Sequence, residues 1–212
     1  MILWEGEERP PCLIKFELIF IDLMRKLKLQ VQMSVDGFVG GPNGELDWMT
    51  WDMDEKIGAY IDKLTDSCDT ILLGRKMTDG FVNHWENVKP DSPEYEFAQK
   101  MNGYKKYVFT KTLDESTWAN TTLAKGDIVD EVNAIKAQDG RDIVVYGGAN
   151  FVSSLIRHDL IDEYNLFINP AAVGKGLTIF GDVADTFRLK LIEATPYECG
   201  ITVNRYVPAR AS

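Results

Sequence analysis

The fold is decided by two stretches of sequence, Leu72-Leu73-Gly74-Arg75-Lys76-Met77-Thr78 and Val144-Val145-Tyr146-Gly147-Gly148-Ala149-Asn150. In each, a short β-branched or aliphatic run leads through glycine into a segment with a helical pattern. Such a strand-to-helix crossing places small residues and free backbone N–H groups at a helix N-terminus, where a phosphate binds well. Only the first crossing carries cations, and the two together can converge on a single dinucleotide.

Strand and helix patterns alternate on both sides of these crossings. Apolar residues alternate with polar ones over 27–33, which is typical of a half-buried strand. The same reasoning predicts further strands over 69–73, 104–110, 142–146, 164–169, 188–195 and 201–207, and helices over 52–65, 76–82, 94–101, 127–137 and 150–157. Glu198-Cys199-Gly200 is predicted to join the last two strands as a hairpin turn. The pattern indicates an α/β fold with a mostly parallel central sheet and a C-terminal antiparallel hairpin.

Composition narrows the classes of function. The chain has 212 residues and a net charge of -10, which disfavours nucleic acid and anionic membranes as partners because both reward a basic surface. Three scattered cysteines and two histidines match no disulfide framework or zinc motif, so we expect no metal site and a cytoplasmic location. Gly174-Lys175-Gly176 lacks the Walker spacing, and no G-x-G-x-x-G fingerprint occurs.

The first 23 residues differ in character from the rest. Their apolar run over 13–21 is too short to span a bilayer and is interrupted by charges. Met24 then opens the regular alternating pattern. We therefore expect residues 1–23 to be a dispensable N-terminal extension and 24–212 to form the functional domain.

The crossings supply candidate phosphate ligands. Gly74 lets the backbone approach a ligand, Arg75 and Lys76 bring charge, and the Thr78 hydroxyl can donate to a phosphate oxygen. A plain turn with solvated cations explains this stretch equally well. The strand end Thr110-Lys111 is a further candidate, suited to a ribose 2′-phosphate, although many strands end in such residues. Gly147-Gly148 suggests a backbone conformation that side chains would forbid, or else a tight turn without a ligand.

Taken in order, these motifs resemble the dihydrofolate reductase-like superfamily. They are most similar to the reductase domain at the C-terminus of bifunctional riboflavin-biosynthesis deaminase–reductases. The matching stretches, within about residues 26–207, are Ser34-Val35-Asp36-Gly37-Phe38-Val39, the two crossings, Phe109-Thr110-Lys111, and Asn169-Pro170…Gly174-Lys175-Gly176…Phe180. No fused deaminase domain or its zinc signature is present, so the chain resembles a stand-alone reductase domain.

The resemblance implies a dihydrofolate reductase-like three-layer fold and an NADPH-dependent reductase. The implied cofactor-binding residues are Val39, Gly74, Arg75, Lys76, Thr78, Thr110, Lys111, Gly147, Gly148, Ala149, Asn150 and Phe151, with a cis peptide expected at Gly147–Gly148. The loop over 34–48 would cover the nicotinamide and the substrate, with Asp36 and Trp48 as substrate-binding residues. The implied reaction is that of 5-amino-6-(5-phosphoribosylamino)uracil reductase, on a small heterocyclic or ribosyl substrate. Relatives of this kind are often dimers, and the hairpin over 188–207 is where a second copy would pack.

Two other functions stay open. Asp52 lies near the position of the acidic residue of dihydrofolate reductases, where a carboxylate can relay a proton to a pterin. It is also well placed to cap the helix that follows it. The Pro-Trp pair typical of true dihydrofolate reductases is absent, because Asp47 precedes Trp48. Apart from Asp52 no proton donor is evident, so a non-catalytic NADPH-binding or sensor protein is the alternative of another class.

Overall fold

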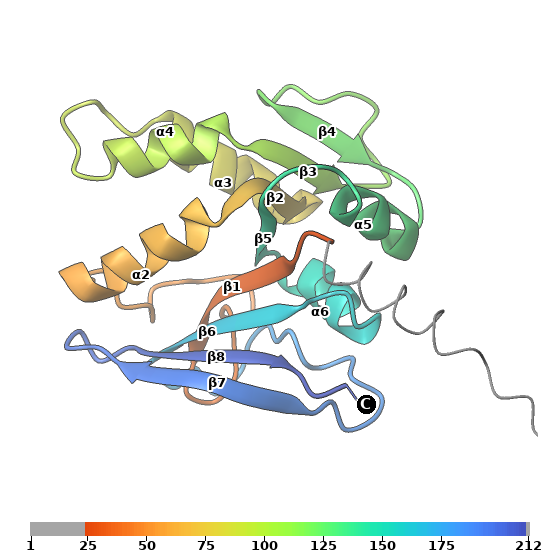
Figure 1. Cartoon of the computed structure of the whole chain (residues 1–212). Coiled ribbons are helices and arrows are strands. Elements are labelled where there is room, and N and C mark those ends of the chain that lie inside the picture. The colour runs from red at the N-terminus through yellow and green to blue at the C-terminus, as the bar shows by residue number, and fades with distance from the viewer. Residues whose placement is uncertain (1–23, 211–212) are drawn as a thin grey trace, which may run out of the picture.

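Alternating side chains place β1 (Leu27–Ser34) at the centre of the sheet. Leu27 and Leu29 are fully buried, whereas Lys28 and Gln30 on the opposite face are partly exposed. The computed structural model describes residues 24–210, and its sheet has eight strands in the order β4-β3-β2-β5-β1-β6-β8-β7 (Figure 1). The first six strands of this order pair in parallel, and β8 and β7 add an antiparallel edge.

The chain order confirms the predicted alternation of strands and helices. After β1 the elements are α2 (Glu55–Asp66), β2 (Cys68–Gly74), α3 (Arg75–Glu86), α4 (Tyr95–Gly103), β3 (Lys105–Phe109), β4 (Thr121–Ala124), α5 (Ile128–Lys136), β5 (Asp142–Gly147), α6 (Ala149–Arg157), β6 (Glu163–Asn169), β7 (Leu189–Pro196) and β8 (Thr202–Pro208). β4 was not predicted, because four residues on a sheet edge carry too short a pattern.

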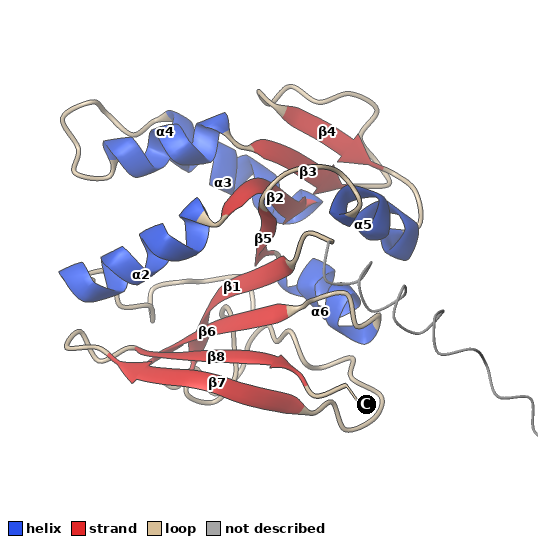
Figure 2. Ribbon diagram, in the orientation of Figure 1, coloured by secondary structure: helices blue, strands red, loops and turns tan. Residues whose placement is uncertain are grey.

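Helices cover both faces of the sheet and make three layers (Figure 2). On one face, α5 and α6 pack their buried residues on Leu29, Val145 and Leu166. On the other face, α3 and α4 cover β2 and β3 through Phe81 and Met101. α2 lies on that same face, but over β6 and β8. This is the three-layer, dihydrofolate reductase-like arrangement expected from the sequence.

Helix α2 begins later than predicted. The Asp54 carboxylate accepts hydrogen bonds from the backbone N–H groups of Lys56 and Ile57, both at 3.0 Å, and so caps the helix. The expectation that Asp52 is the cap is therefore wrong. Asp54 also accepts from the Cys199 N–H at 3.2 Å, which ties the start of α2 to the predicted β7–β8 turn.

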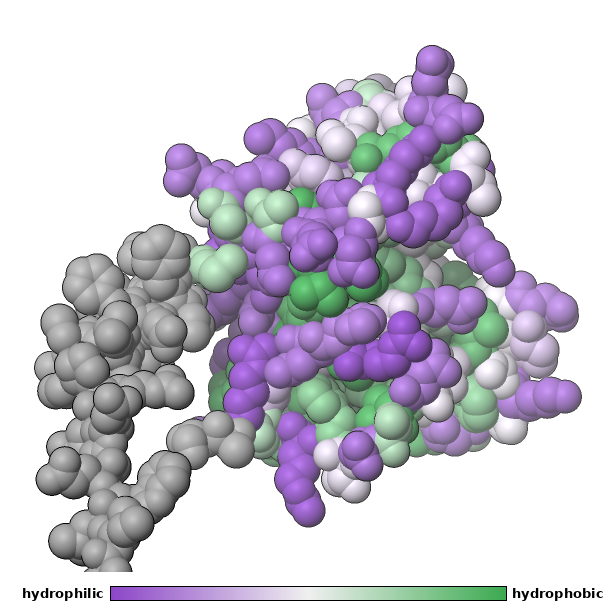
Figure 3. Space-filling model, turned by 90° about the vertical axis from the view of Figure 1, so that its right-hand side faces the viewer, coloured by the Kyte–Doolittle hydropathy of each residue, from purple (hydrophilic) through white to green (hydrophobic). Residues whose placement is uncertain are grey.

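One face of the described part is mainly polar. Figure 3 shows hydrophilic side chains over much of the face at the right of Figure 1, with apolar ones set between them. No helix within residues 24–210 combines the length and apolar character needed to cross a membrane. The extension predicted for residues 1–23 lies outside the described residues.

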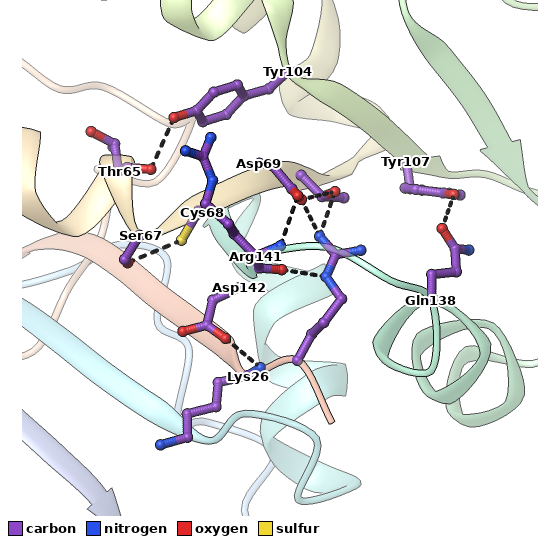
Figure 4. A network of polar contacts seen from close by, with 12 residues as sticks. Lys26, Thr65, Ser67, Cys68, Asp69, Tyr104, Tyr107, Gln138, Arg141 and Asp142 are labelled. Carbon is purple, nitrogen blue, oxygen red and sulfur yellow. Dashed lines mark hydrogen bonds and ion pairs between the residues drawn. The ribbon is translucent and has the colours of Figure 1, made fainter. Parts of the chain in front are cut away.

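The buried cation Arg25 joins three strands at their N-terminal ends. Figure 4 labels its partners Asp69 and Arg141 and the neighbouring residues Lys26 and Asp142. Arg25 is 6% exposed and donates to the carboxylate of Asp69, to the Thr70 hydroxyl and to the Arg141 carbonyl. The other Asp69 oxygen accepts from the Arg141 N–H at 2.8 Å. The Asp142 carboxylate accepts from the Lys26 N–H at 2.9 Å. These contacts hold the starts of β1, β2 and β5 together.

Replacing Asp69 with alanine should destabilise the fold, because the Arg25 guanidinium would stay buried without its anion. We expect a loss of roughly 2 kcal/mol in the free energy of unfolding, less than for a fully buried pair because Asp69 is one third exposed. Urea denaturation followed by circular dichroism measures it. Lys56→Ala, which breaks the exposed pair with Glu198, should change stability by less than about 0.5 kcal/mol. Equal effects of the two variants would contradict this assignment.

Candidate functional site

A cavity of about 790 Å³ opens at the C-terminal ends of the central parallel strands. Its walls come from the end of β1, from residues 39–49 of the loop that follows β1, and from Leu177 and Ile179. Both glycine crossings also line it, β2–α3 at Gly74 and β5–α6 at Gly147. In open α/β sheets ligands bind at this end of the strands.

The cavity exists because two neighbouring strands separate. β1 pairs with β5 over three residue pairs only, from Leu27↔Ile143 to Leu29↔Val145. β1 continues beside β6 as far as Ser34↔Asn169, while β5 continues beside β2 as far as Leu73↔Gly147. The sheet therefore splits between β1 and β5, and the cavity occupies the split.

The two glycine crossings touch each other. A Cβ on Gly74 would lie 2.8 Å from the Cβ of Phe151, closer than real contacts allow, and 3.1 Å from the Gly148 nitrogen, which is tighter than most. Gly147 has a φ of +153°, and the Gly147–Gly148 peptide is cis, as expected. A side chain at position 74 would push the two crossings apart. Glycine therefore keeps a bare backbone surface on the cavity wall.

Both helices that begin at the cavity lack a capping side chain. α3 starts after Gly74 and α6 after Gly148, and neither N-terminus receives a side-chain hydrogen bond. By contrast, Asp54 and Asp127 cap α2 and α5. The backbone N–H groups at the first turns of α3 and α6 are therefore available for an anion.

One end of the cavity is positively charged. Arg75 and Lys76 are the only charged residues among the described ones that line it. The Arg75 guanidinium pairs with Asp79 at 2.7 Å and lies 5.4 Å from the centre of the Trp118 ring. These contacts hold it beside the start of α3. Within residues 24–210 no cluster of histidine, cysteine or acidic side chains is arranged to hold a metal ion.

Comparison with known proteins identifies the family. A sequence model of the family described as "RibD C-terminal domain" matches residues 25–203. The chain belongs to this family. It is 34% identical over 178 residues to "Uncharacterized protein YyaP" of Bacillus subtilis (strain 168), covering 84% of this chain and 92% of that protein.

Solved structures share the fold of this RibD C-terminal domain. One is the Thermotoga maritima diaminohydroxyphosphoribosylaminopyrimidine deaminase/5-amino-6-(5-phosphoribosylamino)uracil reductase, with a TM-score of 0.65 and 16% identity, covering 92% of this chain and 59% of that one. Another is the Enterococcus faecalis dihydrofolate reductase complexed with NADP(H), with a TM-score of 0.57 and 16% identity, covering 87% and 97%. At such identities the likeness concerns the fold.

Most residues predicted to bind the cofactor line the cavity of this RibD C-terminal domain, namely Val39, Gly74, Arg75, Lys76, Gly147, Gly148, Ala149, Asn150 and Phe151. Three others lie elsewhere. The Thr78 hydroxyl is buried and donates to the Gly74 carbonyl at 3.2 Å. Thr110 is buried, and its hydroxyl accepts from the N–H groups of the turn after β3. Lys111 donates to two backbone carbonyls after β4, both at 2.6 Å.

Asp36 joins two loops. Its carboxylate accepts from the Ser34 hydroxyl at 2.6 Å and from the N–H groups of Val173 and Gly174 at 3.1 and 2.7 Å. The Ser34 hydroxyl, followed by these backbone groups, lowers the pKa of Asp36 below its usual value. Asp36 therefore fixes the loop after β1 against the loop after β6. It does not line the large cavity.

The two remaining predicted residues also lie off the cavity. Trp48 lines a separate shallow depression beside Lys175, and its indole N–H donates to the Glu45 carbonyl at 3.0 Å. Asp52 is exposed, near the start of α2. The structure therefore does not place the Asp52 carboxylate where it would face a ring in the cavity.

Sequence reasoning overlooked several lining residues. Gln30 and Gln32 read only as the polar half of the β1 alternation, and Phe109 and Tyr146 read as ordinary strand residues. One available signal was two glutamines on the ligand end of a central strand. The Tyr146 hydroxyl is directed to the Met101 sulfur at 3.6 Å, and burial raises its pKa.

Alanine at position 74 should disturb the cavity wall, because its methyl group meets Phe151 and Gly148. We expect about 1–3 kcal/mol lower stability and, for NADPH as the cofactor expected from the sequence, at least about tenfold weaker binding. Gly80→Ala, in the same helix, is the matched control, because a Cβ there meets nothing within 4 Å. It should stabilise by about 0.5–1 kcal/mol and leave binding unchanged. Denaturation measures the stability of each variant, and fluorescence titration measures its affinity for NADPH. Unaltered binding by Gly74→Ala would contradict the claim that a ligand lies on the backbone at this position.

Proposed function

We propose that the protein is an NADPH-dependent reductase that transfers hydride to a small heterocyclic or ribosyl substrate, in the manner of 5-amino-6-(5-phosphoribosylamino)uracil reductase. The observation that carries this proposal is the pair of touching glycine crossings at the split of the sheet. They bring two uncapped helix N-termini and two cations to one wall of one cavity. Membership of the RibD C-terminal domain family supports the reductase class.

The residues of this wall fit a dinucleotide phosphate. The N–H groups at the starts of α3 and α6 bind phosphate oxygens, and Arg75 and Lys76 neutralise their charge. The Gly74–Gly148 contact lets the cofactor lie directly on the backbone. When bound, NADPH supplies the hydride. Val39 and Ile179 provide apolar surface, and Leu46 and Leu177, which are 44% and 37% exposed, would be covered by the ligands.

A non-catalytic NADPH-binding or sensor protein is the second candidate. It is favoured by the lining of the cavity, in which no described residue is a carboxylate or a histidine. Among residues 24–210, Tyr146 is the one phenol on the wall, and its raised pKa and its contact with Met101 make it a poor acid. In the reductase, water would then supply the proton that accompanies the hydride.

Charge reversal at Arg75 tests the cofactor assignment. Arg75→Glu should weaken NADPH binding by more than about tenfold, because a charge-assisted hydrogen bond to phosphate is replaced by repulsion. If Arg75 holds the 2′-phosphate, NADH binding should fall much less. Lys190→Glu, on the exposed strand β7, makes the same change of charge away from the cavity and should leave NADPH binding unchanged. Fluorescence titration with NADPH and with NADH measures how much affinity Arg75→Glu loses for each cofactor. Equal losses would reject the assignment of Arg75 to the 2′-phosphate.

Turnover separates the candidate functions. We expect NADPH oxidation with 5-amino-6-(5-phosphoribosylamino)uracil and at least about a hundredfold lower kcat/KM with dihydrofolate, because Asp52 lies off the cavity. Absorbance at 340 nm follows the reaction. Activity with dihydrofolate alone would favour the dihydrofolate reductase alternative. Tight NADPH binding without oxidation by either substrate would favour the sensor.

A further inference from the structure

Asn169 is a buried amide whose orientation is set by the main chain. It is the last residue of β6 and is fully buried. Its Oδ1 accepts from the Thr50 N–H at 2.8 Å, and its Nδ2 donates to the Phe167 carbonyl at 3.2 Å. Because a backbone N–H can only donate and a backbone carbonyl can only accept, both contacts require the same orientation of the Asn169 amide.

The orientation of Asn169 determines that of Gln32. The Asn169 Nδ2 also donates to the Gln32 Oε1, at 2.7 Å. The oxygen of Gln32 is therefore occupied, and the group that it can still offer to a ligand is its Nε2 N–H. Gln32 is partly exposed and lines the cavity, and no hydrogen bond of its Nε2 is found within residues 24–210. The cavity wall thus carries a free donor of fixed orientation.

This donor stands on the part of β1 that has left β5. The pairing of β1 with β5 ends at Leu29, and at Gln32 the strand pairs with β6. The loop that follows β1 lines the same cavity with the apolar side chains of Val39, Leu46 and Met49. In apolar surroundings an N–H group forms a stronger hydrogen bond than it does in water.

Other polar side chains of the wall lack this combination. The Asn43 Nδ2 donates to a glutamate of its own loop at 2.7 Å. Arg75 and Lys76 are charged and belong to the β2–α3 crossing. The Gln30 Oε1 has no hydrogen-bond partner within residues 24–210, so it does not fix the orientation of that amide. Gln32 joins a free, uncharged donor to an orientation that is already set.

We propose that Gln32 is a catalytic residue of the reductase and that Asn169 is its positioning residue. In a hydride reduction a C–H bond forms at the substrate carbon, the double bond from that carbon to nitrogen or oxygen becomes single, and NADPH is oxidised to NADP⁺. The nitrogen or oxygen takes the electron pair of the double bond and is then protonated by water. The Gln32 Nε2 donates a hydrogen bond to this atom as its negative charge develops, and Asn169 holds the donor in place beforehand. This inference rests on the proposed function, which makes the cavity the site of a reductase.

Gln32→Glu is the decisive variant, because it keeps an oxygen for Asn169 and replaces the donor with a carboxylate. The assay uses the full chain with NADPH and 5-amino-6-(5-phosphoribosylamino)uracil, followed at 340 nm. Where the new carboxyl is ionised, kcat should fall at least about a hundredfold. NADPH affinity, measured by fluorescence titration, and the melting temperature should stay as in wild type. Gln99→Glu, the same change on the exposed side of α4, should alter none of these quantities.

The pH profile separates a donor from a structural residue. As the pH is lowered, the carboxyl of Gln32→Glu gains a proton that it can donate, so its kcat should rise relative to that of wild type. The described titratable groups on the same wall are Arg75, Lys76 and Tyr146, and both proteins contain them. The ratio of the two kcat values therefore reports the new carboxyl.

Asn169→Asp tests the positioning role. The aspartate still accepts from the Thr50 N–H but cannot donate, so the Gln32 amide must turn and present its oxygen to the cavity. We expect kcat to fall at least about tenfold. In a Gln32→Met background the same change should lower kcat no further, because the donor is already absent. A merely structural role for Asn169 would make the two losses multiply.

The inference is overturned if Gln32→Glu keeps the wild-type kcat, if its kcat does not rise relative to wild type at lower pH, or if the losses of Asn169→Asp and Gln32→Met multiply. Weaker NADPH binding by Gln32→Glu would overturn it by assigning the amide to the cofactor. Where Gln32→Glu fails to fold, Gln32→Met gives the same test of kcat. Wild-type protein that binds NADPH without oxidising it would reject the proposed function and this inference together. An active wild type with an equally active Gln32→Glu would reject this inference alone.

Discussion

The early end of the pairing between β1 and β5 is the constraint on which the rest of the site depends. Three residue pairs join these central strands, and beyond Leu29 and Val145 each strand keeps only its outer neighbour. A sheet that opens at its middle exposes backbone and side chains on both sides of the opening, along β1 and along β5. The buried Arg25 network closes the other end of the same strands, so the opening forms without loss of the sheet.

The two sides of the opening differ in chemistry. The β5 side presents mainly backbone, because Gly148 lies against Gly74 there and the first turns of α3 and α6 follow. The β1 side presents the side-chain amides of Gln30 and Gln32. The cavity is therefore lined by main-chain groups on one side and by side-chain amides on the other.

The sequence was sufficient for features whose cause is local. The glycine crossings, the β1 alternation and the hairpin turn at Gly200 depend on nearby residues, and each was predicted within a few positions. Residues whose position depends on distant packing were harder to place. Thr78 and Lys111 look like phosphate ligands, yet their polar atoms bind the Gly74 carbonyl and the backbone after β4. Asp52 and Asp54 are the same residue type two positions apart, and the structure distinguishes them because Asp54 accepts from the first turn of α2 and from the Cys199 N–H. Gln30 and Gln32 line the cavity, yet in the sequence nothing separates them from other polar residues of an alternating strand.

The hydrogen-bond chain from Thr50 through Asn169 to Gln32 has an evolutionary consequence. Its polarity originates in a main-chain amide, so the side chain at position 50 can drift freely without reversing the amide of Gln32. Only proline at position 50, which lacks the amide hydrogen, would remove the hydrogen bond that orients Asn169. The orientation of the Gln32 amide is therefore encoded in the course of the backbone, where mutation rarely reaches it.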